Sequence, residues 1–204
     1  MARKHLRYFD AMFRILRALA GLVLFAELPV PLYWLILHPS AGFWRRHLRA
    51  AFWIAGLGSW TVGGVLLFLY REELLASTPP RAWQIAVGFS LIAVEFFTFL
   101  LVERQLGTRR LVGHAELTRG GELETSGLYS RIRHPRYAAM FCAMLGACLI
   151  GGTPRLWLVA AVWWLVQLGV IALEEREMMC RFGPAYAEYR RRVPAFLPFR
   201  LRPR

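Results

Sequence analysis

Cysteines and acidic residues are both scarce in this chain of 204 residues, and the shortage of cysteine excludes several kinds of site. Its three cysteines, Cys142, Cys148 and Cys180, have the spacing of neither a metal site nor a disulfide framework. A glycine-rich turn of the strand-to-helix type is also missing, which argues against a Rossmann-type nucleotide site. No short apolar segment with a small-residue cleavage site precedes the first apolar block, so no removable signal peptide is expected. We expect no bound metal.

Long apolar runs are what the chain has instead. Hydrophobic residues make up 57% of it, and the mean hydropathy is +0.38. Nearly uncharged blocks occupy residues 18–37, 50–70, 82–102, 137–154 and 156–173. Each is long enough, or nearly so, to cross a hydrocarbon core of about 30 Å as a helix. We therefore predict an all-α integral membrane protein, a bundle of about five transmembrane helices with a C-terminal amphipathic helix.

The net charge of +13 is best explained by membrane topology. Basic residues flank the apolar blocks and do not form a separate basic domain, so nucleic acid is not an expected partner. Arginine and lysine gather in residues 103–136 and from residue 176 onward. The positive-inside tendency places both segments in the cytoplasm, in what we take to be the inner membrane of a prokaryote.

The N-terminus carries a helical pattern of its own. Arg3, Arg7, Arg14 and Arg17 recur on one face and Leu6, Phe9, Phe13 and Leu16 on the other, as in a helix that lies on the membrane surface. Five crossings place this helix outside the cell. Alternatively, the block 18–37, which contains two prolines, turns back without crossing, and every arginine-rich segment is then cytoplasmic. We expect one integrated domain: residues 1–109 hold this helix and transmembrane helices 1 to 3, and residues 110–204 hold a catalytic segment.

Only Glu27 and Glu95 place charge inside the apolar blocks. An ionisable group in the middle of a block normally faces the bundle interior or a wet cavity, so Glu95 has either a structural hydrogen bond or a functional task. Small residues at 139, 143, 147 and 151 repeat every four positions, which is typical of a face where helices pack closely.

The strongest functional pattern is a helical hairpin whose first arm follows a basic cluster and whose second arm is followed by an acidic pair. Residues 133–137 precede the first arm, residues 151–154 form the turn, and Glu174 and Glu175 end the second apolar block. At 1.5 Å per residue the arms, 137–150 and 156–173, are about 21 and 27 Å long. The hairpin should therefore return the two carboxylates to the basic cluster.

Each side chain near this junction has a chemistry that suits a polar ligand. Pro135 favours the first turn of a helix and puts His134 at its entrance, where free N–H groups attract anions. Arg133 can clamp a carboxylate, and Tyr129 and Tyr137 offer flat faces. Interfacial anchoring explains the arginines and tyrosines equally well, but it does not require two adjacent glutamates.

These motifs resemble those of the isoprenylcysteine carboxyl methyltransferase and phospholipid methyltransferase superfamily. The similarity extends over about residues 110–198 and lies in residues 127–129, 133–137, 174–175, 182–189 and 193–194. It implies an integral membrane enzyme that uses S-adenosylmethionine at the cytosolic face and methylates a lipophilic acceptor arriving through the bilayer. The catalytic residues would be Arg133, His134 and Glu174. The cofactor pocket it implies contains Leu128, Tyr129, His134, Tyr137, Glu174, Glu175, Tyr186 and Tyr189.

The acceptor stays open at this point. Residues 169–173 are wholly apolar, whereas the carboxyl-methylating branch of the superfamily tends to carry charged residues there. Prenylcysteine carboxylates, aminophospholipids and thiols all remain candidates. The main alternative is a non-catalytic membrane protein that binds anionic lipid or a protein partner through its arginine-rich face, and a membrane reductase that binds nicotinamide is a third. The oligomeric state is open as well.

Overall fold

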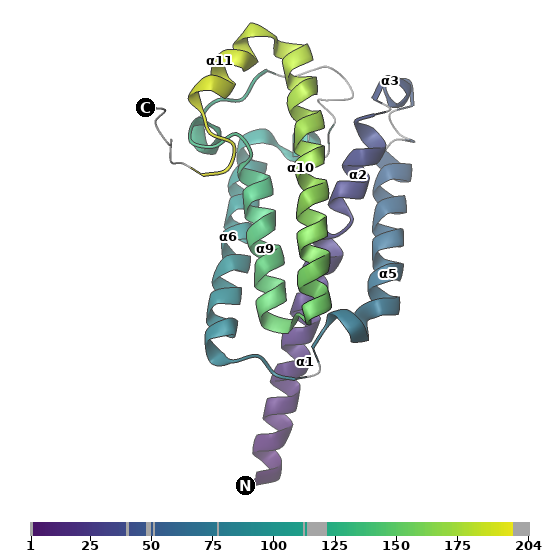
Figure 1. Cartoon of the computed structure of the whole chain (residues 1–204), viewed down its shortest axis with the longest axis vertical. Helices are drawn as coiled ribbons and strands as arrows, with labels where there is room; N and C mark the ends of the chain where they lie inside the picture. The colour runs from purple at the N-terminus through teal and green to yellow at the C-terminus, as the bar shows by residue number, and fades with distance from the viewer. Residues whose placement is uncertain are drawn as a thin grey trace.

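The computed structural model describes residues 2–39, 41–47, 50, 52–76, 78–111, 113 and 122–197, and these form a bundle of helices (Figure 1). The long elements are α1 (Ala2–Glu27), α2 (Val30–Leu37), α5 (Gly58–Leu74), α6 (Ala82–Leu106), α9 (Pro135–Gly151), α10 (Pro154–Phe182) and α11 (Pro184–Arg192). Shorter pieces are α3 (Ala41–Trp44), a π-helical segment η1 (Phe52–Leu57), α7 (Thr108–Leu111) and a 3-10 turn η2 (Gly127–Ser130). The predicted all-α class is confirmed, because the described residues contain no strand beyond one isolated bridge between Leu75 and Gly152.

Four helical segments of the described chain are long and apolar enough to cross a membrane. They are Asp10–Leu37, Trp53–Leu74, Ala82–Leu106 and Pro154–Phe182. The fifth apolar helix, α9, has 17 residues, which is about 26 Å at 1.5 Å per residue. The protein is therefore an integral membrane protein, and its bundle matches the expected number of about five apolar helices.

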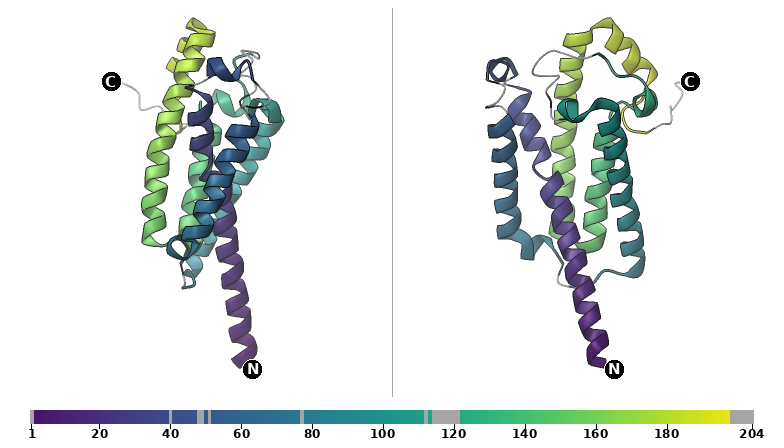
Figure 2. Two further views of the ribbon diagram at one scale, coloured as in Figure 1. Left: turned by 90° about the vertical axis from the view of Figure 1, so that its right-hand side faces the viewer. Right: turned by 180° about the vertical axis from the view of Figure 1, so that it is seen from behind.

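The first apolar block runs the whole length of the bundle. At one end, Arg17 pairs with Glu72 at 2.9 Å, and at the other end His38 lines the same cavity as His134. Pro29 and Pro31 interrupt the helix between Glu27 and Val30, yet α2 continues in the direction of α1 (Figure 2). The block therefore does not turn back within the bundle, and its full crossing of the membrane stays a prediction. The N-terminal amphipathic segment is the first part of α1, and its place at the membrane surface stays a prediction.

Close packing of α6 against α9 positions the functional hairpin. A Cβ atom on Gly146 would lie 2.7 Å from the carbonyl oxygen of Gly88, and one on Gly88 would lie 3.0 Å from that of Gly146. The two backbones can approach this closely only because both residues are glycines. The predicted small-residue face of α9 is also confirmed, since Ala139, Ala143, Ala147 and Gly151 are all buried.

The turn between α9 and α10 is held at the end of the bundle that lies far from His134. The Thr153 side chain caps α10 by accepting from the Leu156 N–H at 3.3 Å, and its hydroxyl donates to the Glu73 carbonyl at 2.6 Å. From there α10 runs back past Glu174 and Glu175, which lie eight and seven residues before its last residue. Gly183, with a φ of 51°, ends α10, and Pro184 begins α11.

Candidate functional site

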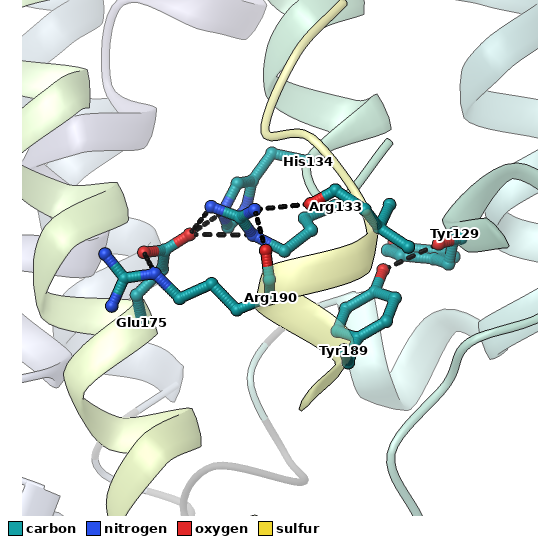
Figure 3. Close-up of polar contacts among 7 residues, drawn as sticks. Tyr129, Arg133, His134, Glu175, Tyr189 and Arg190 are labelled. Carbon is teal, nitrogen blue, oxygen red and sulfur yellow. Dashed lines mark hydrogen bonds and ion pairs between the residues drawn. The ribbon is translucent and has the colours of Figure 1, made fainter. Parts of the chain in front are cut away.

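Glu175 on α10 is the centre of a charged cluster that joins three segments of the chain (Figure 3). Its Oε1 accepts from Arg133 Nε at 3.0 Å and from Arg133 Nη2 at 2.6 Å, and it lies 3.1 Å from His134 Nε2. Its Oε2 lies 3.3 Å from Nε of Arg190 on α11. The basic cluster and one carboxylate of the acidic pair therefore meet as the hairpin predicts.

The remaining donors of Arg133 hold the C-terminal segment. Arg133 Nη1 donates to the carbonyl oxygens of Arg190 at 3.2 Å and Val193 at 2.5 Å. The backbone N–H groups of Arg133 and His134 donate to the carbonyls of Pro194 and Ala195 at 2.8 and 3.0 Å. Arg133 was expected to clamp a ligand carboxylate, but its guanidinium is occupied by its own chain. These bonds hold the C-terminal segment beside α10, and the catalytic role predicted for Arg133 stays a prediction.

The same bonds change the expectation for the entrance of α9. His134 is the N-cap residue of α9, and its N–H is already bonded to Ala195. Pro135 has no N–H. The helix entrance therefore offers an anion fewer free donors than the sequence suggested, because the C-terminal segment lies across it.

A hydrogen bond also links two of the predicted site tyrosines, Tyr129 and Tyr189. The Tyr189 hydroxyl donates to the Tyr129 carbonyl at 2.7 Å and so joins α11 to η2. Burial raises the pKa of Tyr129, and the nearby Glu174 carboxylate raises it further. Burial likewise raises the pKa of Tyr186, and that of Tyr189 to about 12. All three phenols therefore keep their protons at neutral pH and can donate hydrogen bonds.

The loop that carries Tyr129 is anchored to the end of α6. Gln105 Nε2 donates to the Ser126 carbonyl at 2.8 Å, and Glu124 Oε1 accepts from the Ser126 N–H at 2.9 Å and hydroxyl at 2.7 Å. The two hydrogen bonds that Ser126 donates to Glu124, the hydroxyl bond contributing more, lower the pKa of the Glu124 carboxyl group. Gly127 takes a φ of 52°, a backbone conformation that favours glycine.

A cavity of about 730 Å³ opens beside this cluster. This volume lies within the range of roughly 300–1,000 Å³ that small-molecule sites occupy. Of the residues predicted for the site, the cavity is lined by Tyr129, Arg133, His134, Tyr137, Glu174, Tyr186 and Tyr189. Leu128 and Glu175 do not line it. The carbonyl of Leu128 accepts from the N–H groups of Arg131 and Ile132, both at 3.1 Å.

Glu174 differs from its neighbour in having a carboxylate that faces the cavity. Its Oε2 is buried and finds no hydrogen-bond partner among the described residues. A buried carboxylate oxygen without a donor is costly, so a ligand that brings a cation or hydroxyl groups would stabilise it. Of the adjacent pair Glu174 and Glu175, Glu174 is thus the residue that is available to a ligand.

The sequence reasoning missed one entire wall of the cavity. This wall comes from α1 and α2 and contains Ala26, Glu27, Val30, Tyr33, Trp34 and His38. Each of these residues has another of the set three or four positions away, which is the spacing of one helical face and was the available signal. His38 adds an imidazole whose Nε2 is buried without a partner among the described residues. Burial lowers the pKa of His38 and favours its neutral form.

The fold and the site together define an all-α membrane protein with a cavity at one end of its bundle, lined mainly by apolar residues and by a smaller set of charged and polar ones. Residues 83–185 match the phospholipid methyltransferase family, and the chain belongs to that family. This range is half of the chain and includes α9, most of α6 and all of α10.

Three named relatives match somewhat more than a third of the chain. The chain is 35% identical over 77 residues to a protein-S-isoprenylcysteine O-methyltransferase of Schizosaccharomyces pombe, which is 37% of this chain and 33% of that protein. It is 35% identical over 85 residues to the protein of the same name from Xenopus laevis, 38% of this chain and 27% of that protein. It is also 41% identical over 80 residues to the cobalt-zinc-cadmium resistance protein CzcN of Cupriavidus metallidurans, 37% of this chain and 35% of that protein. The matches thus cover about a third of each relative. No solved structure matches the chain.

Proposed function

We propose that the protein is a membrane methyltransferase that transfers the methyl group of S-adenosylmethionine to a lipophilic acceptor. Its membership of the phospholipid methyltransferase family supports the reaction class. Two of the relatives carry methyltransferase names, and the match to them includes about a third of their length. The observation that carries the proposal is the cavity, in which a carboxylate oxygen of Glu174 has no partner among the described residues and which Tyr129, Tyr137, Tyr186 and Tyr189 also line.

The residues of the cavity fit this methyl donor. Glu174 is suited to its ammonium group or its ribose hydroxyls, and the rings of Tyr129, Tyr137 and Tyr186 to its adenine. The hydroxyls of Tyr129 and Tyr186, which also line the cavity, can donate hydrogen bonds to the polar groups of the methyl donor. When bound, the donor supplies an activated methyl group. The protein's task is to align the acceptor with that group and to exclude water, which can account for much of the acceleration of a displacement.

Glu175 lies outside the cavity and supports the site together with Arg133, which lies at its edge. By fixing His134 and the C-terminal segment, they set the distance between α9, α10 and α11. Catalytic groups need supporting contacts of this kind because a shift of about 1 Å can cost a hundredfold in rate.

We place the site at the cytosolic face of the membrane. The end of the bundle that holds the site also carries Arg190, Arg191 and Arg192, and the positive-inside tendency favours the cytoplasm for such a run. The acceptor is lipophilic because apolar residues, including Val30 and Met140, share the cavity with the polar ones.

Saturable binding of S-adenosylmethionine tests the proposal directly. We expect the purified full-length protein to bind it and Glu174→Gln to weaken binding by about 10- to 100-fold, since a hydrogen bond to a charged group contributes roughly 1.5–3 kcal/mol. Isothermal titration calorimetry in lipid nanodiscs provides the measurement. Glu72→Gln makes the same chemical change at the opposite end of the bundle and should bind as the wild type does. Equal affinities for all three proteins would contradict the assignment of Glu174.

A further inference from the structure

The methyl donor has a carboxylate on the same carbon atom as its ammonium group, and this anion needs a partner in the cavity. Glu174 suits the ammonium and would repel the carboxylate. A buried anion is costly unless a cation or hydrogen-bond donors lie beside it. Among the described residues, five basic side chains line the cavity: His38, Arg110, Arg133, His134 and Arg136. They differ in whether the protein already uses their charge.

Three of these side chains are engaged by carboxylates of the protein itself. Arg133 donates to Glu175 Oε1 at 3.0 and 2.6 Å, and His134 Nε2 lies 3.1 Å from the same oxygen. Arg136 Nη1 donates to Oε1 of Glu95, which serves as its counter-charge from the middle of α6. None of the three offers an uncompensated charge to a ligand.

His38 and Arg110 remain, and only Arg110 carries a fixed charge. Burial lowers the pKa of His38, although the Glu174 carboxylate opposes the shift, so the imidazole is neutral at neutral pH. Among the described residues, Arg110 forms no ion pair, and its guanidinium makes a single hydrogen bond, from Nη2 to the Glu122 carbonyl oxygen at 2.8 Å. A guanidinium has five N–H donors, so most of those of Arg110 are available to a ligand.

The end of α6 holds Arg110 at the cavity wall. Gly107, with a φ of 76°, ends α6 and lets the chain turn into α7. The Arg110 N–H donates to the Gly107 carbonyl at 3.1 Å, and the Thr108 hydroxyl donates to Glu103 Oε1 at 2.9 Å. These bonds tie α7 to α6 and place the half-buried Arg110 side chain beside the cavity.

Arg110 and Glu174 bring opposite charges to the same tyrosine. Burial has the largest effect on the pKa of Tyr129 and raises it, the Glu174 carboxylate raises it further, and the Arg110 guanidinium lowers it. All three side chains line the cavity. Glu124 lies on the same wall, but its Oε1 already accepts from the N–H and hydroxyl of Ser126. A cation and an anion near one ring match a ligand whose own two charges share a carbon atom.

We propose that Arg110 binds the carboxylate of the methyl donor while Glu174 binds the neighbouring ammonium, so that the cavity selects ligands with an intact α-amino acid group. This inference rests on the proposed function, since it assigns a residue to the same donor. Hydrogen bonds from a guanidinium to a carboxylate are frequently bidentate and about twice as strong as neutral ones. Arg110 precedes the motifs that predicted the site, the first of which begins at residue 127.

Binding of donor analogues tests the proposal without any turnover. The full-length protein in nanodiscs is titrated by calorimetry with S-adenosylhomocysteine, which has both charges of the amino acid group, and with its decarboxylated analogue, which lacks only the carboxylate. Methylthioadenosine, which lacks both charges, is the third ligand. We expect S-adenosylhomocysteine to bind at least about tenfold more tightly than the decarboxylated analogue, which is 1.4 kcal/mol, and methylthioadenosine to bind most weakly.

Arg110→Gln is the decisive variant. It should weaken the binding of S-adenosylhomocysteine by about 10- to 100-fold and leave that of the decarboxylated analogue unchanged, because only the first ligand has the carboxylate. Glu174→Gln should weaken both. The control is Arg104→Gln, an exposed arginine in the last turn of α6 that does not line the cavity, and it should bind as the wild type does.

Arg110→Lys keeps the charge without the planar fork and should show an intermediate preference. It keeps the proposal testable if Arg110→Gln does not fold.

Several results would overturn the proposal. Equal affinities of the wild type for S-adenosylhomocysteine and the decarboxylated analogue would show that the carboxylate is not recognised. An undiminished preference in Arg110→Gln would assign the carboxylate to another residue, and an equal loss for both ligands would mean that Arg110 only shapes the cavity. If none of the adenosine ligands binds, S-adenosylmethionine included, the proposed function itself is refuted, whereas binding without a carboxylate preference refutes this inference alone.

Discussion

Glu174 and Glu175 are adjacent in the chain, yet they face different partners. Successive residues of an α-helix point about 100° apart, so one carboxylate reaches the cavity while the other reaches Arg133, His134 and Arg190. The side chains of Glu175 and Arg133 are 13% and 10% exposed, and this pair therefore belongs to the class of buried ion pairs whose disruption is costly.

Replacing Glu175 should therefore affect stability, whereas replacing Glu174 should affect ligand binding. Glu175→Gln leaves the Arg133 guanidinium without a counter-charge, and we expect a loss of about 3–5 kcal/mol. For a chain of this size that corresponds to a fall of roughly 6–20 °C in the midpoint of thermal unfolding. Thermal scans of ligand-free protein in one detergent, with Glu174→Gln beside it, measure the difference. A Glu175→Gln protein as stable as Glu174→Gln would show that the cluster is not structural.

At the scale of elements, the site depends on how closely α6 and α9 approach. Gly88 and Gly146 lie where the two backbones meet, and α9 carries His134 and Tyr137 at its end nearest the site. A larger residue at either glycine would meet a carbonyl oxygen of the other helix, which cannot rotate away. The helices would have to separate, and interior overpacking of this kind typically costs about 1–3 kcal/mol.

Gly146→Ala should accordingly destabilise the protein, although alanine favours helices more than glycine does. The matched control is Gly169→Ala in α10, where an added Cβ has no atom within 4 Å. That control should be neutral or more stable, by up to about 1 kcal/mol, because of helix propensity alone. The two variants are compared by thermal unfolding in the same detergent. Equal midpoints would mean that the α6 and α9 contact tolerates a methyl group.

At the scale of the whole molecule, the charged clusters divide the bundle into two ends. One end holds Glu175 and α11, and the other holds the N-terminal half of α1, the turn at Thr153 and the Arg17 to Glu72 pair (Figure 1). The predicted topology of five crossings would put the two ends of the described chain on opposite sides of the membrane.

Labelling of single cysteines tests this orientation. In a protein whose native cysteines are replaced by alanine, we expect Thr78→Cys to react with a membrane-impermeant maleimide added to intact cells and Glu188→Cys to react only after lysis. Both positions lie outside the four long apolar segments; Thr78 is exposed, and the Glu188 side chain is 44% exposed. The reverse pattern would place the site on the outer face. Labelling of both positions in intact cells would contradict the three crossings, by α6, α9 and α10, that separate them.

Local pattern in the sequence determined the helical class, the apolar blocks, the turn at residues 151–154 and the return of the acidic pair to the basic cluster. It could do so because hydrophobic runs, proline and glycine act on neighbouring residues along the chain. Only the tertiary structure decided that the Arg133 guanidinium bonds to other residues of its own chain and that Glu174, not Glu175, lines the cavity. It also decided that Glu27 of α1 lines the same cavity. These facts depend on helix rotation and on contacts between residues more than forty positions apart, and no local pattern encodes either.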